Sequence, residues 1–208
     1  MRALLLLLVA WLGLAPLRAE QDAAVIAIAA LTDPAKLSTL TAKRAANPRF
    51  LKCIYWLHDA RTRRLEPKTV VAEAQAITHS EGPRATLILA ALIRSLDIAE
   101  KLGCLEGDNA DLLRRGRSPT ITHGPYAGEP AEVDHIIPIA VVAHLENEIA
   151  NLELLPRTIN RRLGMKITQR ELSYAGKFRD AGLLTEEEFQ LIQSRYAPAK
   201  AGLEMLVP

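Results

Sequence analysis

The chain has 208 residues, of which 49% are hydrophobic and 4% aromatic, with 26 Lys and Arg against 24 Asp and Glu. Arg2 and Arg18 fall in the first nineteen residues, so the rest of the chain has 24 cations and 24 anions, a formal net charge of zero. No global positive field therefore attracts nucleic acid, which argues against a histone-like, purely electrostatic DNA binder. Residues 20–208 suit one domain, or a main body with an embedded motif.

Residues 1–19 have the layout of a secretory signal peptide. Arg2 precedes an apolar run, residues 4–14, that is too short to span a hydrocarbon core of ~30 Å comfortably as a permanent helix. Ala19 offers a small residue for cleavage before Glu20, although Leu17 is larger than is usual there. We expect an exported protein, periplasmic or extracellular, with an uncleaved membrane anchor as the alternative. No other stretch is long and apolar enough to span a membrane, so no stable insertion is expected after cleavage.

Residues 20–117 are predicted to form a helical region. Asp33-Pro34 and Asn47-Pro48 each combine an N-cap residue with a proline suited to the first helical position. Apolar spacing predicts helices from Pro48 to the basic run at 61–64, over Lys68–Thr78, and from Pro83 to a stop at Gly103. The wide apolar face of the last of these predicts the central core helix.

The two cysteines, Cys53 and Cys104, limit the metal chemistry of the chain. They form no CxxC pair, which excludes a thiolate zinc site. Export would permit a Cys53–Cys104 disulfide, while two buried thiols on helix faces are the alternative. Both readings stay open at this point.

Residues 118–167, hereafter the ββα segment, differ in texture from the helices before them. Thr120–Thr122 favours a strand and is followed by a loop rich in Gly and Pro. Two further short strands are predicted, one around Asp134 and His135 that ends at Pro138, the other over Leu152–Leu155. A helix that carries Asn160 should then run from Pro156 to Gly164.

The order strand, strand, helix could bring Asp134 and Asn160 within reach of one ion. Carboxylate and amide oxygens suit a hard cation, which favours Mg²⁺ over Zn²⁺. The run Asp134-His-Ile-Ile-Pro, followed by Asn151-Leu-Glu-Leu-Leu and by Asn160-Arg-Arg, resembles the ββα-metal finger of HNH endonucleases, in its zinc-free, Asp/Asn-liganded form. The resemblance covers about a quarter of the chain.

The resemblance implies a role for each matching residue. Asp134 and Asn160 would bind one Mg²⁺ or Mn²⁺ ion, and His135 would be the general base, since a neutral imidazole accepts a proton near neutral pH. Asn151 would brace the loop between the strands. Many family members have histidine where this chain has Asn160.

Basic residues flank this motif and are candidates for phosphate contact. One cluster follows the second strand: Arg157, Arg161, Arg162, Lys166 and Arg170. A second precedes the first strand: Arg114, Arg115 and Arg117. A solvated helix face is the alternative for both clusters.

The remaining histidines suggest weaker hypotheses. His123 lies in the loop before the first strand, His144 lies within the segment that joins the strands, and His79 is expected at a helix end. His58-Asp59 resembles the doublet of HD-type metal phosphohydrolases, but no histidine precedes it as that family requires.

After residue 167 the pattern returns to helices. Thr168–Asp180 and Thr185–Tyr196 have helical spacing, and Thr185 with Glu188 forms a capping box. The predicted fold class is therefore α+β and mostly α-helical, with helices at 20–117 and 168–208 around the ββα segment.

These patterns predict an exported, metal-dependent endonuclease that cleaves DNA, RNA or both. No sequence-reading module accompanies the motif, so low sequence specificity is expected. The alternative is a non-catalytic secreted or periplasmic protein, in which helices 20–117 bind a partner and the ββα segment is only scaffold. Nothing in the pattern indicates an oligomeric state.

Overall fold

The computed structural model describes residues 21–197, so the predicted signal peptide lies outside the described residues. The helices are α1 (Ala23–Thr32), α2 (Pro34–Leu37), α3 (Ala46–Thr62), α4 (Pro67–Ile77), α5 (Gly82–Lys101), α6 (Asp108–Arg114), α7 (Arg157–Leu163), α8 (Gln169–Asp180) and α9 (Glu186–Ser194). Strands β1 (Ala131–His135) and β2 (Leu152–Pro156) form one antiparallel sheet. The predicted fold class, α+β and mostly α-helical, is confirmed.

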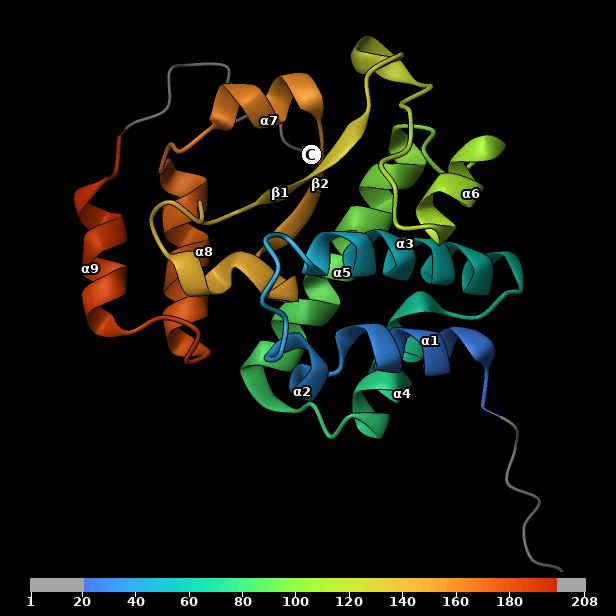
Figure 1. Cartoon of the computed structure of the whole chain (residues 1–208), viewed down its shortest axis with the longest axis horizontal. Coiled ribbons are helices and arrows are strands. Elements are labelled where there is room, and N and C mark those ends of the chain that lie inside the picture. The colour runs from blue at the N-terminus through green and yellow to red at the C-terminus, as the bar shows by residue number, and fades with distance from the viewer. Residues whose placement is uncertain (1–20, 198–208) are drawn as a thin grey trace, which may run out of the picture.

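Helix α5 is the centre of the core, as its broad apolar face predicted. It packs against α3 and α4 and also against β2. Leu92 and Leu96 on this helix are fully buried. Figure 1 shows the two strands crossing the middle of the molecule, with α7, α8 and α9 on one side and α3 and α6 on the other. The ββα segment is therefore built onto the helical body rather than set apart from it.

The register of the sheet divides its side chains between two faces. Val133 pairs with Leu154 and Asp134 with Glu153. Because side chains alternate along a strand, Val133 and Leu154 share one face, while Asp134 and Glu153 share the other. The first face joins the main core. The second meets α7, where Leu155 packs with two apolar residues of that helix, Ile159 and Leu163.

The predicted helix boundaries are largely confirmed, but the predicted N-cap of α3 is wrong. Asp33 caps α2, and Thr185 with Glu188 caps α9, as expected. Asn47, however, is not an N-cap, because α3 begins at Ala46. The Ala46 amide instead donates to Asn147 Oδ1 at 3.0 Å. A residue 101 positions away in the sequence supplies the cap that the local pattern assigned to Asn47.

One further expectation is corrected: the Thr120–Thr122 run forms no strand, and a single bridge joins Thr120 to Pro130 across a loop. Of the two readings left open for Cys53 and Cys104, the structure has the buried thiols: both cysteines are free, and burial raises the pKa of each to about 12. Over residues 21–197, no helix combines the length and apolar character needed to cross a membrane.

Gly103 ends α5 at a point where the following chain comes very close. Its φ is +66°, a region that favours glycine, and a Cβ there would lie 2.0 Å from Thr122 Oγ1. That hydroxyl donates a 2.8 Å hydrogen bond to the Gly103 carbonyl. A side chain at this position would therefore displace the hydroxyl as well as strain the backbone.

We predict that Gly103→Ala lowers the free energy of unfolding by about 2–3 kcal/mol, combining backbone strain with a lost hydrogen bond. Gly182→Ala is the matched control, because Gly182 also follows a helix, has φ +71°, and has no atom within 4 Å of its Cβ position. It should cost only the strain, about 1 kcal/mol. Equal losses in urea unfolding of the two variants would contradict the contact described at Gly103.

Candidate active site

Asp134 lies on β1, on the face that meets α7. One of its oxygens, Oδ1, accepts a 2.8 Å hydrogen bond from the His135 amide. Its other oxygen makes no hydrogen bond with a described residue. Burial raises the pKa of this carboxyl to about 7, and the charge of Glu153 across the sheet adds to the rise; the His135 amide and the charges of Arg170 and Arg44 oppose it. The fold therefore holds a carboxylate that is poorly neutralised by its own neighbours.

His135 ends β1 and is only 7% exposed. Its Nε2 lies 2.9 Å from the carbonyl oxygen of Glu146. Because a carbonyl oxygen can only accept, Nε2 must carry the proton, and Nδ1 is the lone-pair nitrogen of the neutral ring. Burial, together with the charge of Arg44, lowers the pKa of this imidazole below its usual value. His135 is thus a neutral, oriented base at pH 7.

Asn151 holds the loop that joins the two strands. Its side chain is fully buried, accepts from the Ile137 amide at 2.7 Å and donates to the Ile137 carbonyl at 2.9 Å. A weaker contact of 3.4 Å reaches the carbonyl of Leu145. Both sides of the amide are therefore used to fix the turn that follows His135.

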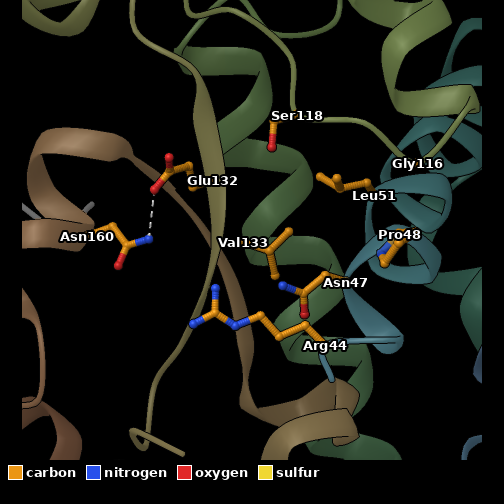
Figure 2. A pocket seen from close by; sticks show the side chains of 9 residues that line it. All are labelled: Arg44, Asn47, Pro48, Leu51, Gly116, Ser118, Glu132, Val133 and Asn160. Atoms are coloured by element: carbon orange, nitrogen blue, oxygen red, sulfur yellow. Dashed lines mark hydrogen bonds between the residues drawn. The ribbon is translucent and has the colours of Figure 1, made fainter. Parts of the chain in front are cut away.

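Asn160 extends from α7 toward β1, where it contacts Glu132 rather than Asp134. Its Nδ2 donates to Glu132 Oε2 at 3.1 Å (Figure 2), and Arg157 Nε donates to the other Glu132 oxygen at 2.8 Å. This arrangement leaves Asn160 Oδ1 without a hydrogen-bond partner among the described residues. Glu132 therefore orients the amide so that its oxygen is available to a ligand.

The predicted metal ligands border two different pockets. Asp134 and His135 line a pocket of about 10 Å³, room for roughly one water, together with Glu153 and Arg170. Asn160 lines a larger pocket of about 300 Å³ along the free edge of β1 (Figure 2). The structure thus brings Asp134 next to His135, and Asn160 next to Glu132.

The donor atoms suit a hard cation. Asp134 and Asn160 each keep one oxygen without a hydrogen bond to a described residue, and oxygen ligands are those that Mg²⁺ and Mn²⁺ prefer. A cation beside Asp134 would also offset the burial that raises the pKa of its carboxyl. Within residues 21–197, no group of three or more His, Cys, Asp or Glu side chains is arranged to hold a metal ion, so a site here depends on the amide oxygen.

The flanking basic residues divide into free and paired groups. Arg161, Arg162 and Lys166 are exposed, and none of them forms an ion pair within residues 21–197. Arg157 is exposed but pairs with Glu132. Arg170 does not fit its predicted phosphate contact, because it lies in ion pairs with the buried carboxylates of Glu153 and Glu171.

The remaining candidates lie away from this site or are engaged elsewhere. Arg114 and Arg115 both pair with Asp111 on the surface of α6. His144 contacts Glu188 and the Leu183 carbonyl, which ties it to α9. In the HD-type doublet, Asp59 pairs with Arg63, and burial lowers the pKa of His58. Among the described residues, His58 belongs to no group of three or more His, Cys, Asp or Glu side chains that could hold a metal ion.

Three residues that shape this site, Glu132, Glu146 and Arg44, were not predicted from the sequence to have a role in it. Glu132 could have been found, because it stands two positions before Asp134 and therefore shares its strand face. Glu146 offered no signal, since its carbonyl holds His135 through the fold of the loop. Arg44 lies about ninety residues earlier in the chain, yet its charge acts on both Asp134 and His135.

The raised pKa of Asp134 has a measurable consequence for stability. The folded carboxyl holds its proton up to about pH 7, whereas the unfolded one releases it near pH 3.8. The ionised group therefore destabilises the fold increasingly as pH rises from 4 to 7, and the penalty is constant above that range. Asn is uncharged and its oxygen can still accept from the His135 amide.

We predict that Asp134→Asn is more stable than the parent protein at pH 8, by on the order of 1–3 kcal/mol, and that this difference shrinks toward pH 4. Thermal unfolding in EDTA between pH 4 and 9 measures it. Asp180→Asn, at an exposed carboxylate, should change little at any pH. A stability difference that does not vary with pH would contradict the burial of Asp134.

The chain was compared with protein families, curated proteins and solved structures. No family model, no curated protein and no solved structure matches the chain.

Proposed function

We propose that this protein is a metal-dependent endonuclease that hydrolyses phosphodiester bonds in nucleic acid, with His135 as the general base. The proposal rests on the pairing, at the end of β1, of a neutral oriented imidazole with a carboxylate that its own neighbours neutralise poorly. Hydrolysis of a phosphodiester needs both parts: a base for the attacking water and positive charge near the phosphate.

His135 has the features of a base that works at neutral pH. The hydrogen bond to Glu146 fixes the ring and leaves Nδ1 as the acceptor. The lowered pKa keeps the ring uncharged near pH 7. In the proposed reaction Nδ1 takes a proton from water as the water oxygen bonds to phosphorus. The bond from phosphorus to the 3′-oxygen breaks, which leaves a 5′-phosphate on the product.

Asp134 and Asn160 border different pockets, so one Mg²⁺ or Mn²⁺ ion held through their free oxygens would have to lie between the two. When bound, this ion would neutralise charge on the scissile phosphate and on the departing 3′-oxygen. Glu132 would keep the Asn160 amide turned for that task, and Asn151 would keep the loop after His135 in place. The exposed side chains of Arg161 and Arg162 on α7, and of Lys166 just after it, would contact phosphates along the strand without reading its sequence.

Two contacts favour a non-catalytic role. The Glu132 contact to Asn160 and the amide contact to Asp134 are both hydrogen bonds that a purely structural ββα segment could use. In that case the chain would be a secreted or periplasmic binding protein. Calorimetric titration with Mg²⁺ or Mn²⁺ separates the two roles. If the protein is an endonuclease, the heat of binding should fit one site, and Asp134→Ala should abolish it. If the protein has only a structural ββα segment, no heat of metal binding is expected.

We predict that the purified chain degrades plasmid DNA, RNA or both in Mg²⁺ and that His135→Ala lowers the rate by about 10²–10⁴-fold, the range for loss of a general base. His123→Ala and His58→Ala are controls, because His123 is exposed in a loop and His58, on α3, lines neither of the two pockets described above. Both should keep the parent rate. Full activity in His135→Ala would exclude this mechanism, and a loss confined to His58→Ala would favour the HD-type reaction.

Export also belongs to the proposal, since it depends on residues 1–19. We expect the mature protein to begin at Glu20 and to be recovered from the periplasm or the medium. N-terminal sequencing of the secreted material checks this, and an intact Met1 in the membrane fraction would favour the anchor instead.

A further inference from the structure

The larger pocket beside β1 joins parts of the chain that are far apart in the sequence. Glu132, Val133 and Asn160 line it from the ββα segment, while Arg44, Asn47 and Leu51 line it from the helical body. Figure 2 shows Arg44 extending from the loop before α3 toward β1, near the side where Glu132 and Asn160 lie. The pocket is therefore an opening at the junction of the two parts, directly next to the candidate active site.

Arg44 is held in an unusual backbone conformation by the loop that also holds His135. Its φ is +55°, a left-handed value that is costly for a residue with a side chain. Glu146 Oε1 accepts the Arg44 amide at 3.1 Å, and Asn147 bonds to Ala46 and Leu40 on either side of it. Glu146 is thus a two-ended brace, since its carboxylate holds Arg44 and its carbonyl holds His135.

The Arg44 side chain is exposed, and no described residue contacts it in a way that would explain this restraint. Within residues 21–197 its guanidinium forms no ion pair and no hydrogen bond, although Arg157 and Arg170 nearby are both paired with carboxylates. The two oxygens of Glu132, the acidic residue of the pocket, are already taken by Arg157 and Asn160. Asn47 Oδ1, also in the pocket wall, is buried without a hydrogen bond. An anion would pair with the guanidinium, whereas Asn47 Oδ1, which can only accept, would need a donor such as water or a ribose 2′-hydroxyl.

We propose that this pocket binds a backbone phosphate of the nucleic acid strand, that Arg44 contacts it, and that Glu146 positions Arg44 and His135 relative to each other. The inference rests on the proposed function for its ligand class. A guanidinium is the side chain best suited to phosphate, through two parallel hydrogen bonds. A phosphate held here would lie beside both Asn160 and the edge of β1. The nucleic-acid strand that carries it could then run past His135, the proposed general base.

The test measures binding separately from cleavage. The whole chain is titrated into a fluorescein-labelled oligonucleotide in Ca²⁺, with anisotropy read at several salt concentrations. Arg44→Ala should weaken binding about tenfold and reduce the slope of log K against log salt by about one, as expected for one lost phosphate contact. Lys43→Ala removes the same charge from the adjacent exposed residue and should leave the slope nearly unchanged. Arg64→Ala controls for backbone strain, because Arg64 also has a positive φ, +64°.

Each result decides one question. Equal binding by Arg44→Ala and Lys43→Ala, or no binding by the parent protein, would overturn the phosphate site. An acidic peptide is titrated in the same way. If Arg44→Ala loses binding to the peptide but not to the oligonucleotide, the phosphate site is overturned in favour of a protein ligand. Plasmid cleavage is read in parallel: binding that depends on Arg44 without any cleavage removes only the proposed hydrolysis, and cleavage with Arg44-independent binding removes only this inference.

Glu146 is tested by paired variants. Glu146→Ala removes the acceptor for the Arg44 amide, whereas Glu146→Gln keeps an oxygen in the same place; both leave the carbonyl that holds His135. Glu146→Ala should weaken oligonucleotide binding as much as Arg44→Ala does, and the double variant should be no weaker than either. Glu146→Gln should bind like the parent protein. Additive losses in the double variant would show that Glu146 does not act through Arg44.

Discussion

The hydrogen bonds of Asn151 are the constraint on which the candidate site depends. This fully buried amide accepts from and donates to Ile137, the second residue after β1. They fix where the chain leaves the strand, and so where the ring of His135 points and which carbonyl it meets. A buried amide that lost one partner would cost more than the bond itself is worth, because the remaining polar atom would be stranded away from water. The loop therefore has one favourable arrangement.

Local patterns predicted the parts of this fold that neighbours in the sequence determine. The strand carrying Asp134, the helix carrying Asn160 and its end at Gly164 follow from alternation, proline and glycine. The cap of α3 could not be predicted, because Asn147 replaces Asn47 across 101 positions. For the same reason Arg44 and Glu146 gave no signal: their roles arise only when the loop before α3 meets the loop between the strands.

The site also contains a charged residue, Asp134, that lowers the stability of the fold. Asp134 lies across from Glu153, in a setting that burial makes unfavourable for a charge, and a residue chosen for packing alone would not be acidic there. Arg170 offsets part of this, but two of its nitrogens are already committed to Glu153 and Glu171. Such concentrations of poorly compensated charge are common at functional sites, although structural ion-pair networks produce them too.

The Glu153–Arg170 ion pair has a consequence for how this architecture could be inherited. Glu153 is completely buried on β2, and its counter-ion comes from α8, beyond the residue where the ββα segment ends. A copy of residues 118–167 moved into another protein would carry a buried carboxylate without its cation, a severe defect. The unit that recombination could transfer intact is therefore longer than the motif, and descendants of this chain should retain or lose the strand glutamate and the helix arginine together.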